Sequence, residues 1–62
     1  MILTWPQRAA MNRLDKSEIG HEPIRYTIAN ALVRRGLAEF VYHRGNIRLT
    51  DAGQAWNLSI ST

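Results

Sequence analysis

The residues best suited to chemistry in this chain share one face of a predicted helix. The i, i+3, i+4, i+7 spacing of that face brings together four residues: Thr27, Asn30, Ala31 and Arg34. An asparagine side chain can make a paired contact to adenine, and an arginine can do the same to guanine. Asn30 and Arg34 therefore predict a surface that recognises base edges in duplex DNA by hydrogen bonding. The alternative is a solvated helix face with an arginine that complements the helix dipole.

Other polar and basic residues add to this candidate surface. Tyr26 and Thr27 could contact a phosphate or the methyl group of a thymine, although Tyr26 could equally cover the core. Arg44 and Arg48 belong to a predicted hairpin and could contact phosphates, or they could only keep the hairpin soluble.

The net charge of +3 comes from the second part of the chain. Eight bases, seven of them arginines, stand against five acids. Residues 1–22 hold three bases and three acids, and residues 23–62 hold five bases and two acids. Because the planar guanidinium matches phosphates and guanine, this bias favours a nucleic-acid partner. A charge of +3 is nevertheless small for a free-standing DNA-binding protein.

Nothing in the sequence predicts catalysis. There is no paired carboxylate with a plausible cleft, no Ser/His/Asp set and no Gly-rich phosphate loop. His21 and His43 stand 22 residues apart without other candidate ligands, and cysteine is absent. We therefore expect no enzyme, no cofactor and no metal site.

The length of 62 residues allows one domain, because a domain usually takes roughly 150 residues. We expect this domain to span residues 1–62, with a core over about 3–57 and a short tail over 58–62. A hydrophobic content of 45% is too high for disorder. No apolar run approaches the ~20 residues of a membrane span, and the first residues lack a signal peptide, so we expect a cytoplasmic protein that does not enter a membrane.

The first predicted helix runs over about residues 5–15. Thr4 and Gln7 form the T-x-x-Q pattern of a capping box, and Ala10, Met11 and Leu14 recur on one face behind it. Residues 16–22 show no period. They could form a loop, with or without one short helical turn or an extended segment.

The second predicted helix spans residues 24–35. Pro23 suits a first turn, and Ile28, Leu32 and Arg35 follow helical spacing toward the core. Gly36 suits the left-handed conformation that ends a helix. Residues 37–42 and 47–50 then predict a β-hairpin, with its tip at 43–46.

A third helix is predicted to begin at Thr50 and Asp51. Its expected inward face carries Ala52, Ala55 and Trp56, and Gly53 would allow a close approach of two backbones. We also expect Trp5 and Trp56 to close the core. Three residues of the C-terminal segment could contact a second copy or another protein: Trp56, Leu58 and Ile60.

The order of these elements resembles a small winged helix-turn-helix domain. It is similar to bacterial and phage regulators of the multiple-antibiotic-resistance type, in which an L-x-x-R-G-L helix end precedes a hairpin and L-T-x-x-G. Here these motifs are Leu32–Leu37 and Leu49–Gly53, and the resemblance covers roughly residues 3–56. The implied fold is α+β, with three helices and a two-stranded hairpin as the wing on the C-terminal side.

The resemblance implies a DNA-binding transcriptional regulator. Helix 24–35 would enter the major groove of double-stranded DNA, and the 43–46 hairpin would form the wing. The DNA-facing residues would be Arg25, Tyr26, Thr27, Asn30 and Arg34, with Arg44 on the wing and Arg48 on its return strand. The alternative is a winged-helix module for protein interaction, an adaptor or a phage-type inhibitor of a host protein, that does not bind DNA.

Overall fold

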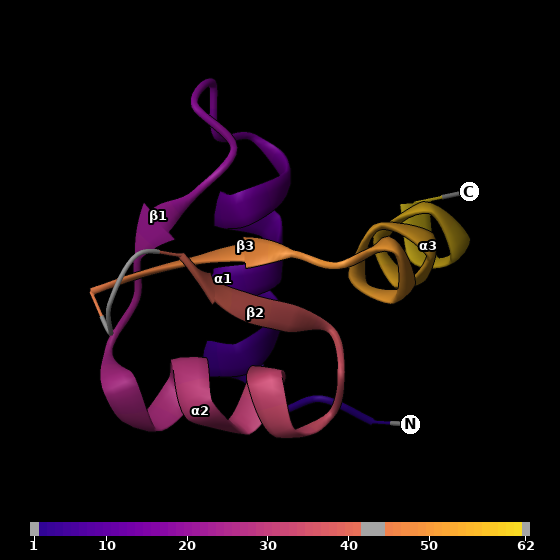
Figure 1. Ribbon diagram of the computed structural model, residues 1–62. Coiled ribbons are helices and arrows are strands. Elements are labelled where there is room, and N and C mark those ends of the chain that lie inside the picture. Colours follow the sequence, from indigo (N-terminus) through magenta and orange to yellow (C-terminus); the bar gives the residue numbers. More distant parts are fainter. Residues whose placement is uncertain (1, 42–44, 62) are drawn as a thin grey trace.

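The computed structural model describes residues 2–41 and 45–61. In this part of the chain it shows three helices and a three-stranded antiparallel sheet (Figure 1). The elements follow one another as α1 (Trp5–Asp15), β1 (Glu22–Pro23), α2 (Tyr26–Arg34), β2 (Ala38–Val41), β3 (Asn46–Leu49) and α3 (Asp51–Ser61). The predicted α+β class is confirmed.

Helix α1 has the bounds that the sequence predicts. The hydroxyl of Thr4 accepts a hydrogen bond from the backbone N–H of Gln7 at 3.4 Å, and the Gln7 side chain accepts one from the N–H of Thr4 at 3.1 Å. This capping box satisfies two backbone donors that the helix itself leaves free. Ala10, Met11 and Leu14 are buried, which confirms the predicted inward face.

The sheet differs from the predicted two-stranded hairpin. Its strand order is β1-β3-β2, because Glu22 and Pro23 add a third strand opposite Ile47 and Asn46. The helix expected over residues 24–35 therefore starts later than predicted, at Tyr26. Proline fits the short edge strand because it cannot donate a hydrogen bond to a ladder.

Helix α2 ends as predicted, at a glycine in the left-handed region. Gly36 has a φ of +78°. Its N–H donates to the carbonyl of Val33 at 3.0 Å, and the N–H of Leu37 donates to the carbonyl of Leu32 at 3.1 Å. This pair of bonds is a Schellman motif, which satisfies the last carbonyls of the helix and turns the chain into β2.

Strands β2 and β3 pair as the predicted hairpin, with Phe40 opposite Ile47 and Glu39 opposite Arg48. Ile47 is buried, whereas Glu39 and Arg48 are exposed, so the sheet has one core face and one solvent face. The tip residues His43 and Arg44 lie outside the described residues.

Helix α3 starts as predicted but packs through other residues. Thr50 caps it by accepting from the N–H of Gly53 at 3.1 Å. Ala52 and Ala55, which were expected to face inward, are exposed, whereas Gly53 and Asn57 are buried. The helix continues to Ser61 and so includes most of the segment that was expected to be a short tail.

Two contacts hold α3 against the rest of the molecule. The backbone passes so close to the residue before β2 that a Cβ atom on Gly53 would lie 2.0 Å from the carbonyl oxygen of Leu37. The predicted close approach at Gly53 is confirmed. The side chain of Asn57 donates to the backbone carbonyl of Met11 at 3.3 Å and so joins α3 to α1.

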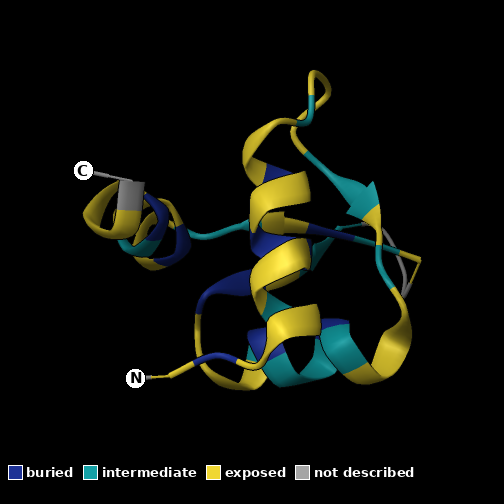
Figure 2. Ribbon diagram, turned by 180° about the vertical axis from the view of Figure 1, so that it is seen from behind, coloured by how far each residue is buried: buried dark blue, intermediate teal, exposed yellow. Residues whose placement is uncertain are grey.

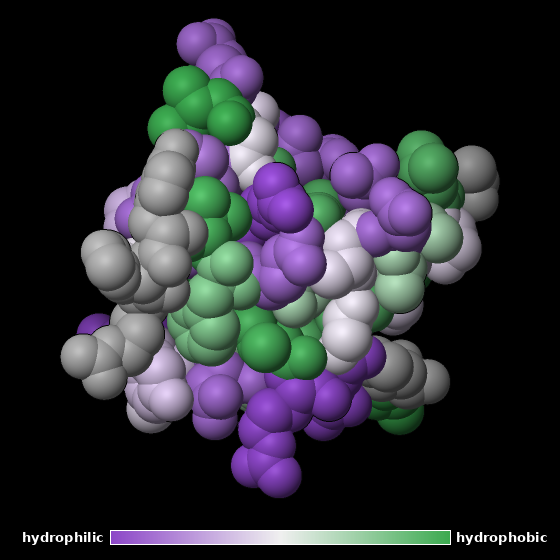
Figure 3. Space-filling model, viewed as in Figure 1, coloured by the Kyte–Doolittle hydropathy of each residue, from purple (hydrophilic) through white to green (hydrophobic). Residues whose placement is uncertain are grey.

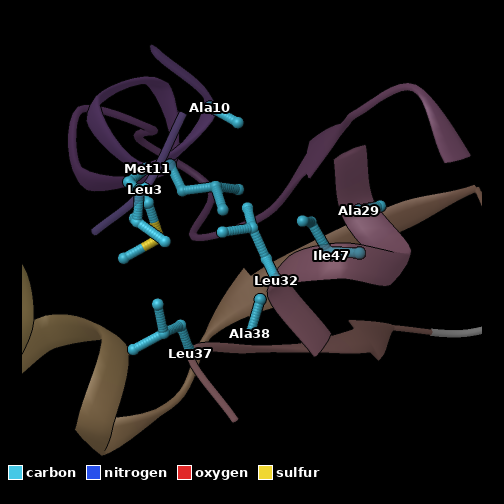
Figure 4. Close-up of a cluster of buried hydrophobic side chains, with 9 residues drawn as sticks. Leu3, Ala10, Met11, Ala29, Leu32, Leu37, Ala38 and Ile47 are labelled. Atoms are coloured by element: carbon cyan, nitrogen blue, oxygen red, sulfur yellow. The ribbon is translucent and has the colours of Figure 1, made fainter. Parts of the chain in front are cut away.

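The core lies where α1, α2 and the sheet meet (Figure 4). Met11, Leu32 and Ile47 are fully buried and come from three different elements. Nine residues make up the buried cluster: Leu3, Ala10, Met11, Leu14, Ala29, Leu32, Leu37, Ala38 and Ile47. Trp56 packs against this cluster, as expected. The same prediction for Trp5 is wrong, since Trp5 is 81% exposed.

Candidate nucleic-acid interface

The structure places the predicted reading surface on the outer side of α2. Four residues form the outward face of α2: Thr27, Asn30, Ala31 and Arg34. At 3.6 residues per turn they fall within about 100° of one another and opposite the buried Ala29 and Leu32. Thr27 and Arg34 are exposed, and Asn30 and Ala31 are partly exposed. Helix α3 lies off to the other side of the fold and does not cover α2 (Figure 1).

The surroundings of this face are positively charged. Residues 23–38 contain three arginines and no carboxylate. Arg25, Arg34 and Arg35 are exposed, and none of them forms an ion pair within the described residues. Figure 3 shows the resulting hydrophilic surface along the lower edge of the molecule, where α2 lies.

Arg35 belongs to this basic surface, although its spacing led us to expect it to point toward the core. It is the C-cap residue of α2 and is exposed. Its position at the end of the helix is a signal for exposure. The negative end of the helix dipole favours a basic side chain there, and this interaction does not require the side chain to be buried.

Tyr26 connects the start of α2 to the hairpin. Its ring stacks on Phe40 of β2, with 6.1 Å between the ring centroids and 13° between the ring planes. The side chain is still half exposed. Tyr26 therefore covers part of the sheet and at the same time presents an edge to solvent next to Arg25.

Arg48 lies on the solvent face of the sheet, away from this surface. Its Nε donates to Oε1 of Glu39 at 2.6 Å. The same two side chains line a groove with Asp15 and Asp51, here called the acidic groove. A phosphate contact by Arg48 would have to compete with three carboxylates, which makes Arg48 a weaker candidate than the arginines of α2. The predicted contact at Arg44 lies outside the described residues.

The segment between α1 and α2 is held by its own polar contacts. Arg13 donates to Oε1 of Glu22 at 3.1 Å, and the Ser17 hydroxyl lies 3.0 Å from Oε2 of the same carboxylate. These contacts fix β1 against α1 and so determine where α2 begins. The described residues 16–25 contain turns, bends and β1, but no helix. Helices α1 and α2 are thus not joined by the turn of roughly three or four residues that defines a helix-turn-helix.

Residues 2–41 and 45–61 contain neither a candidate metal site nor a candidate membrane span. No three histidine, aspartate or glutamate side chains come together there in a way that could hold a metal ion. None of the helices in this part of the chain combines the length and the apolar character needed to cross a membrane.

Comparison of the chain with protein-family models, with curated proteins and with solved structures found no match. Any assignment of function therefore depends on the surface itself.

Proposed function

We propose that this chain is a small DNA-binding domain that places the outward face of α2 on double-stranded DNA. The observation that supports the proposal is the combination of exposure and charge: this face is open to solvent and acid-free, it carries Arg34, and Arg25 and Arg35 border it. None of these three arginines forms an ion pair in the described part of the chain. Duplex DNA has a high density of negative charge, so such a face is attracted to it whatever the base sequence of the DNA.

The side chains of α2 divide into two roles in this proposal. Asn30 and Arg34 project from the outward face and would contact base edges in the major groove. Arg25 and Arg35 flank the face and would contact the phosphates on its two sides. The proposed regulatory role in transcription rests on such sequence reading.

The hairpin would act as a wing. The Tyr26–Phe40 stack holds β2 against the start of α2, so a helix in the major groove would bring the hairpin close to the neighbouring DNA backbone. The proposed fold is thus a reduced winged helix, in which β1 and the turns before it replace a separate helix in front of α2.

Fluorescence anisotropy with a labelled random duplex at low salt tests the proposal. Arg34→Ala removes one charged contact, and we expect it to weaken binding by about fivefold. The matched control is Lys16→Ala, which changes the net charge equally at the exposed C-cap of α1 and should leave the affinity within about twofold of the parent. Equal affinity of Arg34→Ala and the parent, or no binding by the parent, would contradict the proposal.

A second function, protein interaction without DNA binding, is favoured by one observation. An apolar groove runs between α1 and α2, where Pro6, Ala9, Ile24 and Ile28 line it. Monomeric proteins rarely leave contiguous apolar surface without a use. This function would be indicated by a stoichiometric protein partner that survives nuclease treatment, together with no affinity for duplex DNA at low salt.

A further inference from the structure

Helix α1 carries an exposed face that the DNA-binding proposal does not use. Five residues form this face, here called the α1 stripe: Trp5, Arg8, Ala9, Asn12 and Asp15. Together with Ile60 of α3 they line one groove between the two helices. Figure 2 shows that the outer side of α1 is exposed over its length. Trp5 is 81% exposed and Ile60 is 49% exposed, so two large apolar side chains in the lining of this groove are open to solvent.

The two charges of the α1 stripe have opposite signs and lie at opposite ends of it. Arg8 and Asp15 are seven residues apart, which puts them on the same side of the helix and about 10 Å apart along its axis. Within the described residues neither of them forms an ion pair. Asn12, a polar residue without charge, lies between them. A stripe with this charge order is complementary to a second copy of itself that runs in the opposite direction.

A two-fold axis that passes near Asn12, perpendicular to the plane of two antiparallel α1 helices, satisfies this complementarity. Because rotation about this axis does not invert the direction perpendicular to the plane of the two α1 helices, the two α3 helices lie on the same side of that plane. Arg8 of one copy then lies opposite the partner's Asp15, and Asp15 lies opposite the partner's Arg8. A contact in which each residue pairs reciprocally is the signature of a symmetric dimer.

We propose that the chain forms a symmetric homodimer through antiparallel pairing of the α1 stripe. The two Arg8–Asp15 pairs set the direction. Trp5, about one turn before Arg8, would be covered by the segment that follows the partner's α1, and Ile60 borders the same groove. Stable dimers bury about 800 Å² on each partner, against a total accessible surface of 4451 Å² here. A helix face about 16 Å long is a small footprint, so the dimer forms at high protein concentration and dissociates on dilution.

This surface replaces the one that the sequence suggested at the C-terminus. Leu58 and Ile60 are two residues apart in α3 and so point about 200° apart. Leu58 lines the acidic groove, whereas Ile60 lines the groove with Trp5. Of these two, only Ile60 belongs to the proposed interface.

The dimer and the DNA-binding proposal are independent but geometrically compatible. Helix α2 packs on the opposite flank of α1 from α3, because Arg13, Ile24 and Ile28 line the groove between α1 and α2. The two-fold axis described above would therefore put both α2 helices on one side of the dimer.

Sedimentation equilibrium of charge-reversal variants tests the dimer. We expect the parent to associate with increasing concentration, and Arg8→Asp and Asp15→Arg each to stay monomeric, because each brings like charges together at both pairs. An equimolar mixture of these two variants should form a heterodimer, since every pair in it is again one acid and one base. A monomeric parent at all concentrations, or a mixture that associates no better than the separate variants, would overturn the proposal.

A second pair of variants tests the apolar part and controls for folding. Trp5→Ser should weaken association at least tenfold, whereas Leu58→Ser, at another exposed apolar position outside the α1 stripe, should leave it unchanged. Far-ultraviolet circular dichroism should show parental helix content for all four variants, because each changed side chain is exposed. Equal loss of association in Trp5→Ser and Leu58→Ser would contradict the assigned surface.

Discussion

At the scale of single residues, Gly53 shows how one position fixes the place of α3. The absence of a side chain lets this helix approach β2 until the carbonyl oxygen of Leu37 occupies the space of a Cβ atom. That carbonyl also accepts the N–H of Thr50 at 3.1 Å, so it cannot move away without losing a hydrogen bond.

Gly53→Ala should therefore destabilise the protein by about 3 kcal/mol, because α3 must shift to relieve the overlap. Gly45→Ala is the control, since a Cβ atom there meets nothing within 4 Å. Urea denaturation measures both, and similar unfolding midpoints for the two variants would show that α3 does not pack as described.

Tyr26 has a structural role and a proposed binding role that two substitutions separate. Tyr26→Phe keeps the stack on Phe40 and removes only the hydroxyl, so the free energy of unfolding should change by less than about 0.5 kcal/mol. Tyr26→Ala removes the ring and should cost about 1 kcal/mol or more. Duplex affinity that falls in Tyr26→Phe would indicate a hydroxyl contact to DNA; unchanged affinity would leave Tyr26 only its packing role.

At the scale of elements, local signals predicted helix boundaries better than they predicted strands. The capping box at Thr4 and the left-handed Gly36 depend on neighbours within a few residues, and both are found in the structure. Strand β1 has only two residues, and its pairing with β3 is a long-range contact that no local pattern carries. Pro23 does not distinguish the two structures, because proline suits a first helical turn as well as an edge strand.

The sequence predicted the buried face of α1 correctly, but it did not predict the exposure of Trp5 or the C-terminal end of α3. Trp5 precedes Leu14 by nine residues, two and a half turns, so it must point away from the buried face of α1. The spacing from Leu14 therefore indicates an exposed Trp5 in the sequence itself. In α3, residues 58–62 were expected to form a short tail after the core, and the helix that starts at the Thr50 cap includes this segment as far as Ser61.

Thr50 connects two elements, and its removal should cost more than the loss of an ordinary cap. Its hydroxyl accepts from Gly53 and donates to the carbonyl of Gly36 at 2.6 Å, so it joins the start of α3 to the end of α2. We expect Thr50→Ala to lower the free energy of unfolding by about 2 kcal/mol and Thr4→Ala, at an exposed cap, by about 1 kcal/mol. Thr50→Ser retains both bonds, so thermal unfolding that ranks it with Thr50→Ala would contradict this role.

At the scale of the whole molecule, the charges are separated although the net charge is small. Three carboxylates line the acidic groove beside α3, whereas the charged residues of α2 and its two ends, residues 25–35, are all arginines. A net charge of +3 therefore understates the attraction that α2 can offer to a polyanion. Orientation toward DNA would follow from this separation, with the acidic groove turned away.

The salt dependence of binding should reflect the arginines of α2 rather than the net charge. Contacts to three to five phosphates predict a slope of log K against log salt between about −2.7 and −4.5. Anisotropy titrations over a range of salt concentrations measure this slope. Arg48→Ala should leave it unchanged, because Arg48 is already paired with Glu39; a slope near zero in the parent would mean that α2 does not contact phosphates.

The most direct test of the central claim is a nuclear magnetic resonance titration of the ¹⁵N-labelled protein with a short duplex at low salt. The amide signals of residues 25–35 should shift most, and those of Asp15, Glu39 and Asp51 around the acidic groove should stay in place. Shifts that spare α2 while they appear at the acidic groove or in α3, or no shifts at all, would contradict the assignment of α2 as the DNA-binding surface.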